Sequence, residues 1–231
     1  FRSTIQKAQL GLLSREGDYY QVLEAGQHRL PWFNTPEVLI VNRDGGEVPQ
    51  ALAEYLRRFQ PEWVARFCLV ADTTDTEAAA LYINGVLQEI LPPASRRLYW
   101  RADEALTLVR MDTREVQVPT DVMNAVLQPR RSGAVKGREA ILTVQVPAWH
   151  VGVLKIDGET QALLLPGLTA YWKVNHLIEA EVVDTRLQVL EVGGQEILTK
   201  DKVNLRLNLA ANWRYRDVLL AFGQLTKIGR A

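Results

Sequence analysis

The tripeptide Asp-Thr-Arg occurs twice in the sequence, 72 positions apart, and each copy holds an acid close to a base. On a β-strand, residues i and i+2 share one face, so Asp112 is expected to point the same way as Arg114, and Asp184 the same way as Arg186. Such a pair could serve a hydrolytic or ligand-binding site. However, a neighbouring arginine keeps a carboxylate ionised, whereas a general base needs a pKa near the working pH. The triplets therefore favour a structural ion pair over catalysis.

Other residues that commonly bind metals or act as nucleophiles are few. The histidines, His28, His150 and His176, lack the close spacing of a metal-ligand pair, and Cys68 has no second cysteine for a zinc site or a disulfide. Cys68 lies in an apolar run and is predicted to be a buried, inert thiol. No nucleophile elbow, phosphate-binding loop or dinucleotide fingerprint occurs. We predict no enzyme activity, no metal site and no cofactor.

The charges balance, with 27 Lys and Arg residues against 27 Asp and Glu residues. A general nucleic-acid binder usually has a basic excess because phosphate neutralisation supplies most of its affinity, so we predict no nucleic-acid partner. One basic cluster lies between residues 128 and 138. We interpret it as a solvated linker, with contact to phosphates or lipid headgroups as the alternative. Its basic residues are Arg130, Arg131, Lys136 and Arg138.

Glycines at predicted hairpin turns recur along the sequence, and a tryptophan follows each of them after 14 or 15 residues. The turns read Glu-Gly, Asn-Gly and Asp-Gly, and the last two are strong signals for a type I′ turn. The glycines are Gly17, Gly85 and Gly158, and the tryptophans are Trp32, Trp100 and Trp172. Each Asp-Thr-Arg triplet ends 14 residues past the second or third tryptophan. This recurrence indicates a repeated β-module in which the tryptophans pack, with a membrane or subunit interface as their alternative role.

Helices are predicted between the β-rich stretches. Residues 48–67 show an amphipathic pattern that Pro61 must break. Residues 120–128 form a shorter candidate helix, capped by Thr120 or Asp121.

The sequence therefore predicts an α+β fold dominated by antiparallel sheet, with three related copies of one module. The predicted divisions are a first module at 1–48, a helical connector at 49–66, a second module at 67–128, a basic linker at 129–139 and a third module at 140–231. Within the third module we expect a hairpin at Gly193-Gly194, an alternating strand from Val203 and the start of a helix at 215–227.

The third module also carries five short motifs in a fixed order. They are Gly152-Val153-Leu154 with Gly158; Pro166-Gly167-Leu168; Val183-Asp184-Thr185-Arg186; Thr199-Lys200-Asp201-Lys202-Val203; and Trp213-Arg214-Tyr215 with Asp217. Over residues 141–222 this order resembles the stomatin/prohibitin/flotillin (SPFH, or PHB) domain, most closely that of the bacterial slipins. The sequence departs from the family where it lacks a proline after Pro-Gly-Leu, and where two degenerate modules precede the domain instead of a membrane anchor.

The resemblance implies a non-enzymatic scaffold that forms homo-oligomers on the cytoplasmic side of a membrane. It implies that a long helical segment after residue 225 supports the oligomer, and that membrane contact uses segments outside this sequence. A membrane protease of the NfeD type is the implied partner.

Two other functions stay open from the residues alone. One is a soluble adaptor that binds a partner through an exposed sheet edge. The other is a hydrolase that uses the Asp-Thr-Arg strands. Because the sequence begins with Phe and no apolar run reaches the roughly 18–20 residues of a membrane span, we expect a soluble piece of a longer protein.

Overall fold

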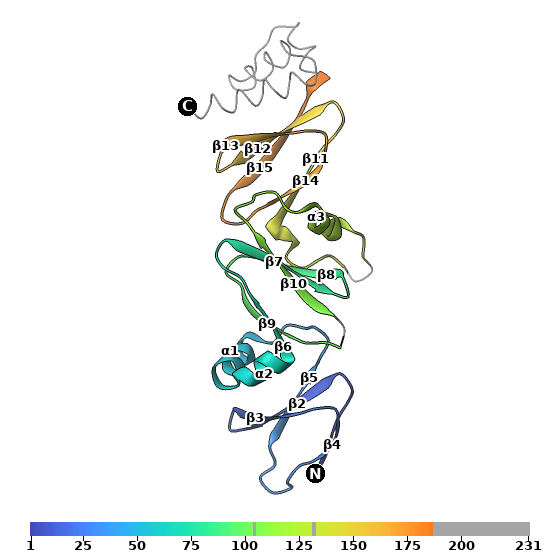
Figure 1. The fold of residues 1–231 in the computed structure, drawn as a ribbon, viewed down its shortest axis with the longest axis vertical. Coiled ribbons are helices and arrows are strands. Elements are labelled where there is room, and N and C mark those ends of the chain that lie inside the picture. Colours follow the sequence, from blue (N-terminus) through green and yellow to red (C-terminus); the bar gives the residue numbers. More distant parts are fainter. Residues whose placement is uncertain (104, 131–132, 187–231) are drawn as a thin grey trace. The chain divides into compact units, whose positions relative to one another are not determined.

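The computed structural model describes residues 1–103, 105–130 and 133–186. Its strands follow the chain in three sets of five, which we call the first, second and third modules (Figure 1). The first module contains β1 (Arg2–Ile5), β2 (Gln9–Arg15), β3 (Asp18–Leu23), β4 (Gly26–Arg29) and β5 (Glu37–Asn42). The second contains β6 (Cys68–Asp72), β7 (Glu77–Ile83), β8 (Val86–Leu91), β9 (Arg96–Trp100) and β10 (Leu106–Asp112). The third contains β11 (Ile141–Val146), β12 (His150–Ile156), β13 (Glu159–Leu164), β14 (Gly167–Trp172) and β15 (Ile178–Asp184).

The strand pairing is the same in all three modules. The first strand pairs with the fourth, and the second strand lies between the third and the fifth. Every one of these pairs is antiparallel. The predicted α+β class with mainly antiparallel sheet is thereby confirmed. That the modules arose as copies of one unit stays a prediction, which the shared pairing order supports.

The second and third strands of each module are joined by a two-residue turn. Both turn residues have positive φ, as in Asn84 at 49° and Gly85 at 75°. Glu16-Gly17 and Asp157-Gly158 have the same conformation. Positive φ at both central residues is the mark of a type I′ turn, whose twist matches that of the flanking strands. The predicted hairpin turns are confirmed, including the Glu-Gly turn with the weaker signal.

A small residue in the second strand lets the first strand pass close to it. A Cβ atom added to Gly11 would lie 2.7 Å from Ile5 Cδ1, and one added to Gly152 would lie 2.9 Å from Val146 Cγ2. In the second module the same place is taken by Ala79, which is fully buried. The small residue is therefore required because two strand layers meet there.

The predicted helices occur between the modules. Helix α1 (Gln50–Phe59) and helix α2 (Pro61–Phe67) are separated at Gln60, which confirms the break at Pro61. Helix α3 (Thr120–Leu127) follows the second module. The predicted cap at Thr120 or Asp121 is wrong, because Pro119 takes the cap position and no side chain caps the helix.

The described chain divides into two compact units. One holds residues 1–112 and 133–137, and the other holds the remaining described residues from 113 on. In this division the segment with α3 belongs to the same unit as the third module. The predicted module boundaries stay a prediction.

Part of the basic linker pairs with a strand of the second module, whereas we predicted that the whole linker is solvated. The Lys136 N–H donates to Gln88 O (3.4 Å), and the Ile90 N–H donates to Lys136 O (2.8 Å), so the segment runs along β8. Val135 is buried. Gly137 has φ 76°, and a Cβ there would lie 2.0 Å from Ile90 O. The close approach of the β8 backbone therefore requires glycine at position 137. The chain continues as a short 3-10 helix at Arg138–Ala140. The predicted hairpin at Gly193-Gly194, the strand from Val203 and the helix at 215–227 lie outside the described residues.

Candidate functional site

The segment that leaves the first module adds a strand to the second. The Val48 N–H donates to Leu98 O (2.8 Å), the Trp100 N–H donates to Gly46 O (2.9 Å), and Glu47 faces Tyr99 across the ladder. The β6–β9 pair therefore gains a short third strand from the preceding module. We call this place the first junction.

The segment that leaves the second module makes the same contact with the third. The Val118 N–H donates to Ala170 O (2.8 Å), the Trp172 N–H donates to Val116 O (2.9 Å), and Gln117 faces Tyr171. We call this place the second junction. In both cases a proline follows the added strand and a helix begins directly after it, because proline suits the start of a helix but cannot extend a ladder.

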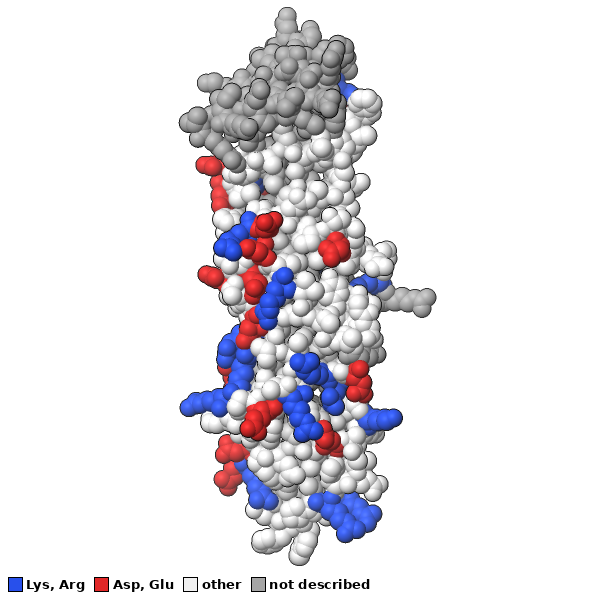
Figure 2. All heavy atoms as spheres, in the orientation of Figure 1, with Lys and Arg blue, Asp and Glu red and all other residues white. Residues whose placement is uncertain are grey.

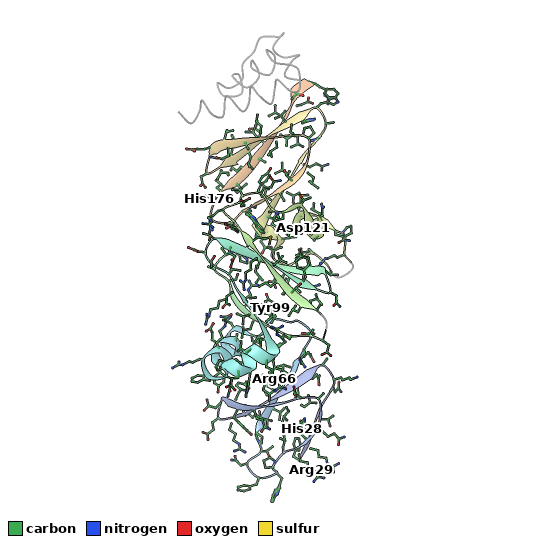
Figure 3. All side chains as sticks on the ribbon, viewed as in Figure 1. His28, Arg29, Arg66, Tyr99, Asp121 and His176 are labelled. Atoms are coloured by element: carbon green, nitrogen blue, oxygen red, sulfur yellow. The ribbon has the colours of Figure 1, made fainter. Side chains whose placement is uncertain are left out.

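The first junction carries a cluster of charged and hydroxyl groups. The Tyr99 hydroxyl donates to Glu89 Oε2 (2.9 Å), and the Arg97 guanidinium binds the other oxygen of Glu89. Arg97 Nε also lies 3.7 Å from Glu47 Oε1, on the added strand itself. The cluster therefore ties β8 and β9 to the strand that arrives from the first module. Figure 3 labels its Tyr99.

Burial and mutual contacts together set the protonation of Tyr99 and Arg97. Burial raises the pKa of the Tyr99 hydroxyl far above its ordinary value, although the hydrogen bond with Arg97 works in the opposite direction. Burial by itself would lower the pKa of Arg97, but contact with Tyr99 and Glu89 raises it. Tyr99 thus stays a neutral hydrogen-bond donor and Arg97 stays charged, which suits a structural tie and gives no general base near neutral pH.

Helix α1 is fastened to the same module by two ion pairs. Arg57 binds Asp72 through two parallel contacts, Nη1–Oδ2 at 2.7 Å and Nη2–Oδ1 at 2.6 Å, and its Nη2 also donates to Arg97 O (3.2 Å). Arg96 Nε lies 2.7 Å from Glu54 Oε1, and this bond lowers the pKa of Glu54. Beneath these pairs, Leu56, Ala53 and Val48 join one core with residues of both modules.

The second junction is held by apolar contacts instead. Val116 packs against the cluster that contains Tyr171 and Ile178. The Tyr171 hydroxyl donates to Thr169 Oγ1 (3.1 Å) on its own strand rather than to the added strand. Val122 and Met123 are the buried residues of α3.

Each Asp-Thr-Arg triplet stands at the end of its own strand, and Asp112 lies in the first unit whereas Asp184 lies in the second. Strand β10 ends at Asp112 and β15 ends at Asp184, so both arginines fall beyond the strand. The expectation that acid and base share a strand face is therefore wrong. Instead Asp184 directly precedes the helical residues Thr185 and Arg186. Its Oδ1 accepts the Arg186 N–H (2.9 Å), and its Oδ2 lies 3.4 Å from Arg186 Nη2. This is a structural ion pair; Arg114 is exposed beside the buried Thr113.

The three tryptophans do not share one environment. Trp100 and Trp172 end β9 and β14, pair with Cys68 and Ile141, and are buried. Trp32 follows β4 in a loop and is 85% exposed, so a packing role for it is wrong.

The registers explain the mismatch. Gly26 pairs with the last residue of β1, and Gly167 pairs with the last residue of β11. The residue five positions beyond Gly26 is Pro31, and the residue five positions beyond Gly167 is Trp172. Trp32 therefore lies one residue past the place in the first module that corresponds to Trp172.

The residues of the basic cluster are divided among different settings. Arg130 is half-buried after α3, Lys136 is exposed on the segment along β8, and Arg138 is exposed where the 3-10 helix begins. Arg131 lies outside the described residues. Lys136 and Arg138 also fall in different units, so no shared basic surface is assigned to them.

The histidines and Cys68 make local contacts. His28 Nε2 lies 2.7 Å from Glu24 O, and His176 Nδ1 lies 2.8 Å from Asp157 Oδ2. His150 Nδ1 lies 2.8 Å from Ala148 O and its Nε2 3.5 Å from Asp184 Oδ2. Cys68 is buried, as predicted, and burial raises the pKa of its thiol to about 11.

Sequence reasoning missed the cluster of Glu47, Glu89, Arg97 and Tyr99. These residues come from three segments that meet only in the fold, so no local pattern joins them. A signal for the junctions does exist in the sequence, because Glu-Val-Pro at 47–49 and Gln-Val-Pro at 117–119 both precede a helix.

Residues 144–227 match the model of the SPFH domain / Band 7 family. No curated protein and no solved structure matches the chain. Across residues 1–103, 105–130 and 133–186, no group of three or more His, Cys, Asp or Glu side chains is arranged to hold a metal ion. No helix in this described part combines the length and the apolar character that crossing a membrane requires.

Proposed function

From the membership of the chain in the SPFH domain / Band 7 family, through its residues 144–227, we propose that it is a membrane-associated scaffold of the stomatin or slipin type. The family consists in general of non-enzymatic scaffolds at membranes. In this protein the scaffold assembles into homo-oligomers on the cytoplasmic side of a membrane. It organises membrane proteins there, with a membrane protease of the NfeD type as its partner.

The family match carries this proposal, and the junctions support it. A scaffold must keep its binding surfaces at fixed places, and the first junction joins two modules through a shared core, a shared ladder and paired charges. The triplets that suggested chemistry both begin at a strand end, and the first continues into a turn whereas the second continues into helical residues. The described third module thus supplies architecture, and its assembly depends on the segment after residue 225.

The test is the size and membrane attachment of the natural full-length protein. After gentle detergent extraction of membranes, we expect particles of many subunits in size-exclusion chromatography with light scattering. The matched variants Asp112→Asn and Asp184→Asn are expected to keep the particle size, because the scaffold function does not use either carboxylate for chemistry. A monomer found in the membrane-free fraction would contradict the proposal.

A soluble adaptor is the second candidate, and strand addition at the two junctions favours it. Strands β9 and β14 each accept an added strand within the chain, so the module has the geometry for binding an extended peptide. Affinity capture with the full-length protein separates the candidates: an adaptor recovers an unrelated partner in equal amount, whereas a scaffold recovers chiefly its own copies.

A further inference from the structure

The loop between β4 and β5 presents two aromatic side chains to solvent. Trp32 is 85% exposed and Phe33 is 78% exposed, and their rings meet edge to face with centroids 6.4 Å apart. Large apolar side chains that are exposed together mark an interaction site more often than a single exposed one does.

The loop holds these rings in an ordered turn. Thr35 Oγ1 lies 3.1 Å from Pro31 O and 3.3 Å from Trp32 O, within hydrogen-bond distance of both. Asn34 has a positive φ of 55°, and Pro36 is buried where the chain returns to β5. The ordered backbone of the loop therefore keeps both rings exposed to solvent. Little conformational entropy of the loop is lost when the rings bind a partner surface.

Two arginines stand beside this loop on one face of the β1–β4 ribbon. Arg2 is paired directly across from Arg29, and both side chains are exposed. Like charges opposite each other destabilise an antiparallel pair. Neither arginine makes an ion pair with any residue that the structure describes. An anion bound between them removes the repulsion, and the guanidinium fork suits phosphate oxygens.

The figures show the same end of the module. Figure 3 labels Arg29 beside the β4–β5 loop. On the face drawn in Figure 2, one basic patch at this end has no acidic side chain beside it, whereas another basic side chain there adjoins acidic ones.

The exposed β4–β5 loop is not explained as a place where an added strand pairs with β4. At the second junction the Trp172 N–H donates to the added strand, whereas Pro31 holds the corresponding place after β4 and has no N–H. Proline at a sheet edge discourages pairing. The edge of β4 is thus a poor acceptor for the outgoing segment of another module or of a second copy.

We propose that the β4–β5 loop with Arg2 and Arg29 is a contact element for an anionic membrane surface. Trp32 and Phe33 enter the interfacial layer, where aromatic rings are favoured, and the arginines bind lipid phosphates. The proposal deepens the proposed function, since it rests on membrane association and names the residues that contact the lipid.

The experiment is co-sedimentation of the 231-residue chain with vesicles of phosphatidylcholine alone or with added phosphatidylserine. We expect binding to the anionic vesicles that weakens with salt, because exposed charges are screened. Each basic residue at an anionic surface contributes about fivefold, so Arg2→Gln with Arg29→Gln is expected to weaken binding about 30-fold. Trp32→Ser with Phe33→Ser is expected to weaken it at least tenfold or so, from the apolar area lost.

Control variants make similar changes elsewhere in the chain. Lys7→Gln with Lys173→Gln removes the same charge elsewhere, and Trp149→Ser removes another exposed tryptophan; both are expected to leave vesicle binding nearly unchanged. Circular dichroism spectra identical to that of the wild type establish that the loop variants fold.

Each outcome decides the question. If the loop variants bind vesicles as the wild type does, the membrane-contact site is wrong while membrane association stands. If the wild-type chain binds no anionic vesicle, or gains only self-association through Trp32 and Phe33, the site is wrong as well. Membrane attachment of the full-length protein, measured separately, then decides the proposed function.

Discussion

The two junctions use one kind of backbone contact and different side chains. In each, an added strand donates to and accepts from the fourth strand of the next module, with distances that agree within 0.1 Å. The first junction is fastened by Arg97, Glu89 and Tyr99, whereas the second relies on Val116 and Tyr171. The comparison indicates that the ladder is the constant device and that side chains set how firmly each helix is held.

The helices at the two junctions differ in the same way, because α1 is held by ion pairs and α3 by apolar contacts. Helix α1 is bound by ion pairs at Arg57 and Glu54 and continues into α2, so its contacts reach both modules. Helix α3 is shorter and contributes Val122 and Met123 to burial. The first junction should therefore respond to salt and to pH, and the second should respond mainly to changes in apolar area.

The largest expected effect is the loss of a core side chain under α1. Leu56 is 1% exposed, and Leu56→Ala is expected to lower the free energy of unfolding by about 2–5 kcal/mol through lost apolar contact and a cavity. Met123→Ala in α3 is expected near the lower end of that range. Urea denaturation followed by circular dichroism measures both. The exposed Phe59→Ala is the control, and a cost as large as that of Leu56→Ala would show that α1 is not held by its buried face.

The next effect concerns the ion pair between Arg57 and Asp72. The Arg57 side chain is largely buried at 14% exposure, so Arg57→Met is expected to cost about 1–3 kcal/mol, discounted because Asp72 is 36% exposed. The difference in free energy of unfolding between this variant and the wild type should become smaller as the salt concentration rises. Val116→Ala at the second junction should show no such convergence; equal salt responses would remove the distinction between the junctions.

Tyr99 and Tyr171 occupy equivalent places at the first and second junctions, so substituting each one compares how firmly the two junctions are held. Tyr99→Phe removes a hydrogen bond to a carboxylate and is expected to cost about 2 kcal/mol, whereas Tyr171→Phe removes a neutral bond within one strand and is expected to cost about 1 kcal/mol or less. Thermal unfolding of the two variants side by side is the measurement. A reversed order would mean that the Tyr99 cluster does not strengthen the first junction.

The smallest effect is the pH response of Glu54. The bond from Arg96 lowers the pKa of this exposed carboxylate, so its contribution to stability is present above its ordinary pKa of 4.5 and is lost as pH falls through the lowered value. Wild type and Glu54→Gln should therefore differ slightly at neutral pH and coincide in acid. A difference that grows on acidification would contradict the assignment.

Local features were predictable from the sequence, and long-range ones were not. The hairpin turns follow from the dipeptide at each turn, and the break at Pro61 follows from the missing N–H of proline. The third-module motifs led to the family that residues 144–227 match. These signals lie within a few residues of the structure that they determine.

The failures have physical reasons. Trp32 was aligned by counting from a turn glycine, but the place of Trp172 is fixed by pairing with β11, and Pro31 occupies that place in the first module. The acid and base of each triplet were placed on one strand, but each strand ends at its Asp. The docking of Lys136 along β8 depends on the backbone of a distant strand, which no pattern in the linker encodes.

The most direct test of a membrane-associated scaffold is flotation of the natural full-length protein through a density gradient with native membranes. The scaffold account predicts that the protein rises with the membrane fraction and, after detergent treatment, migrates as a large homo-oligomer. Protein that stays at the bottom of the gradient as a soluble monomer would contradict it.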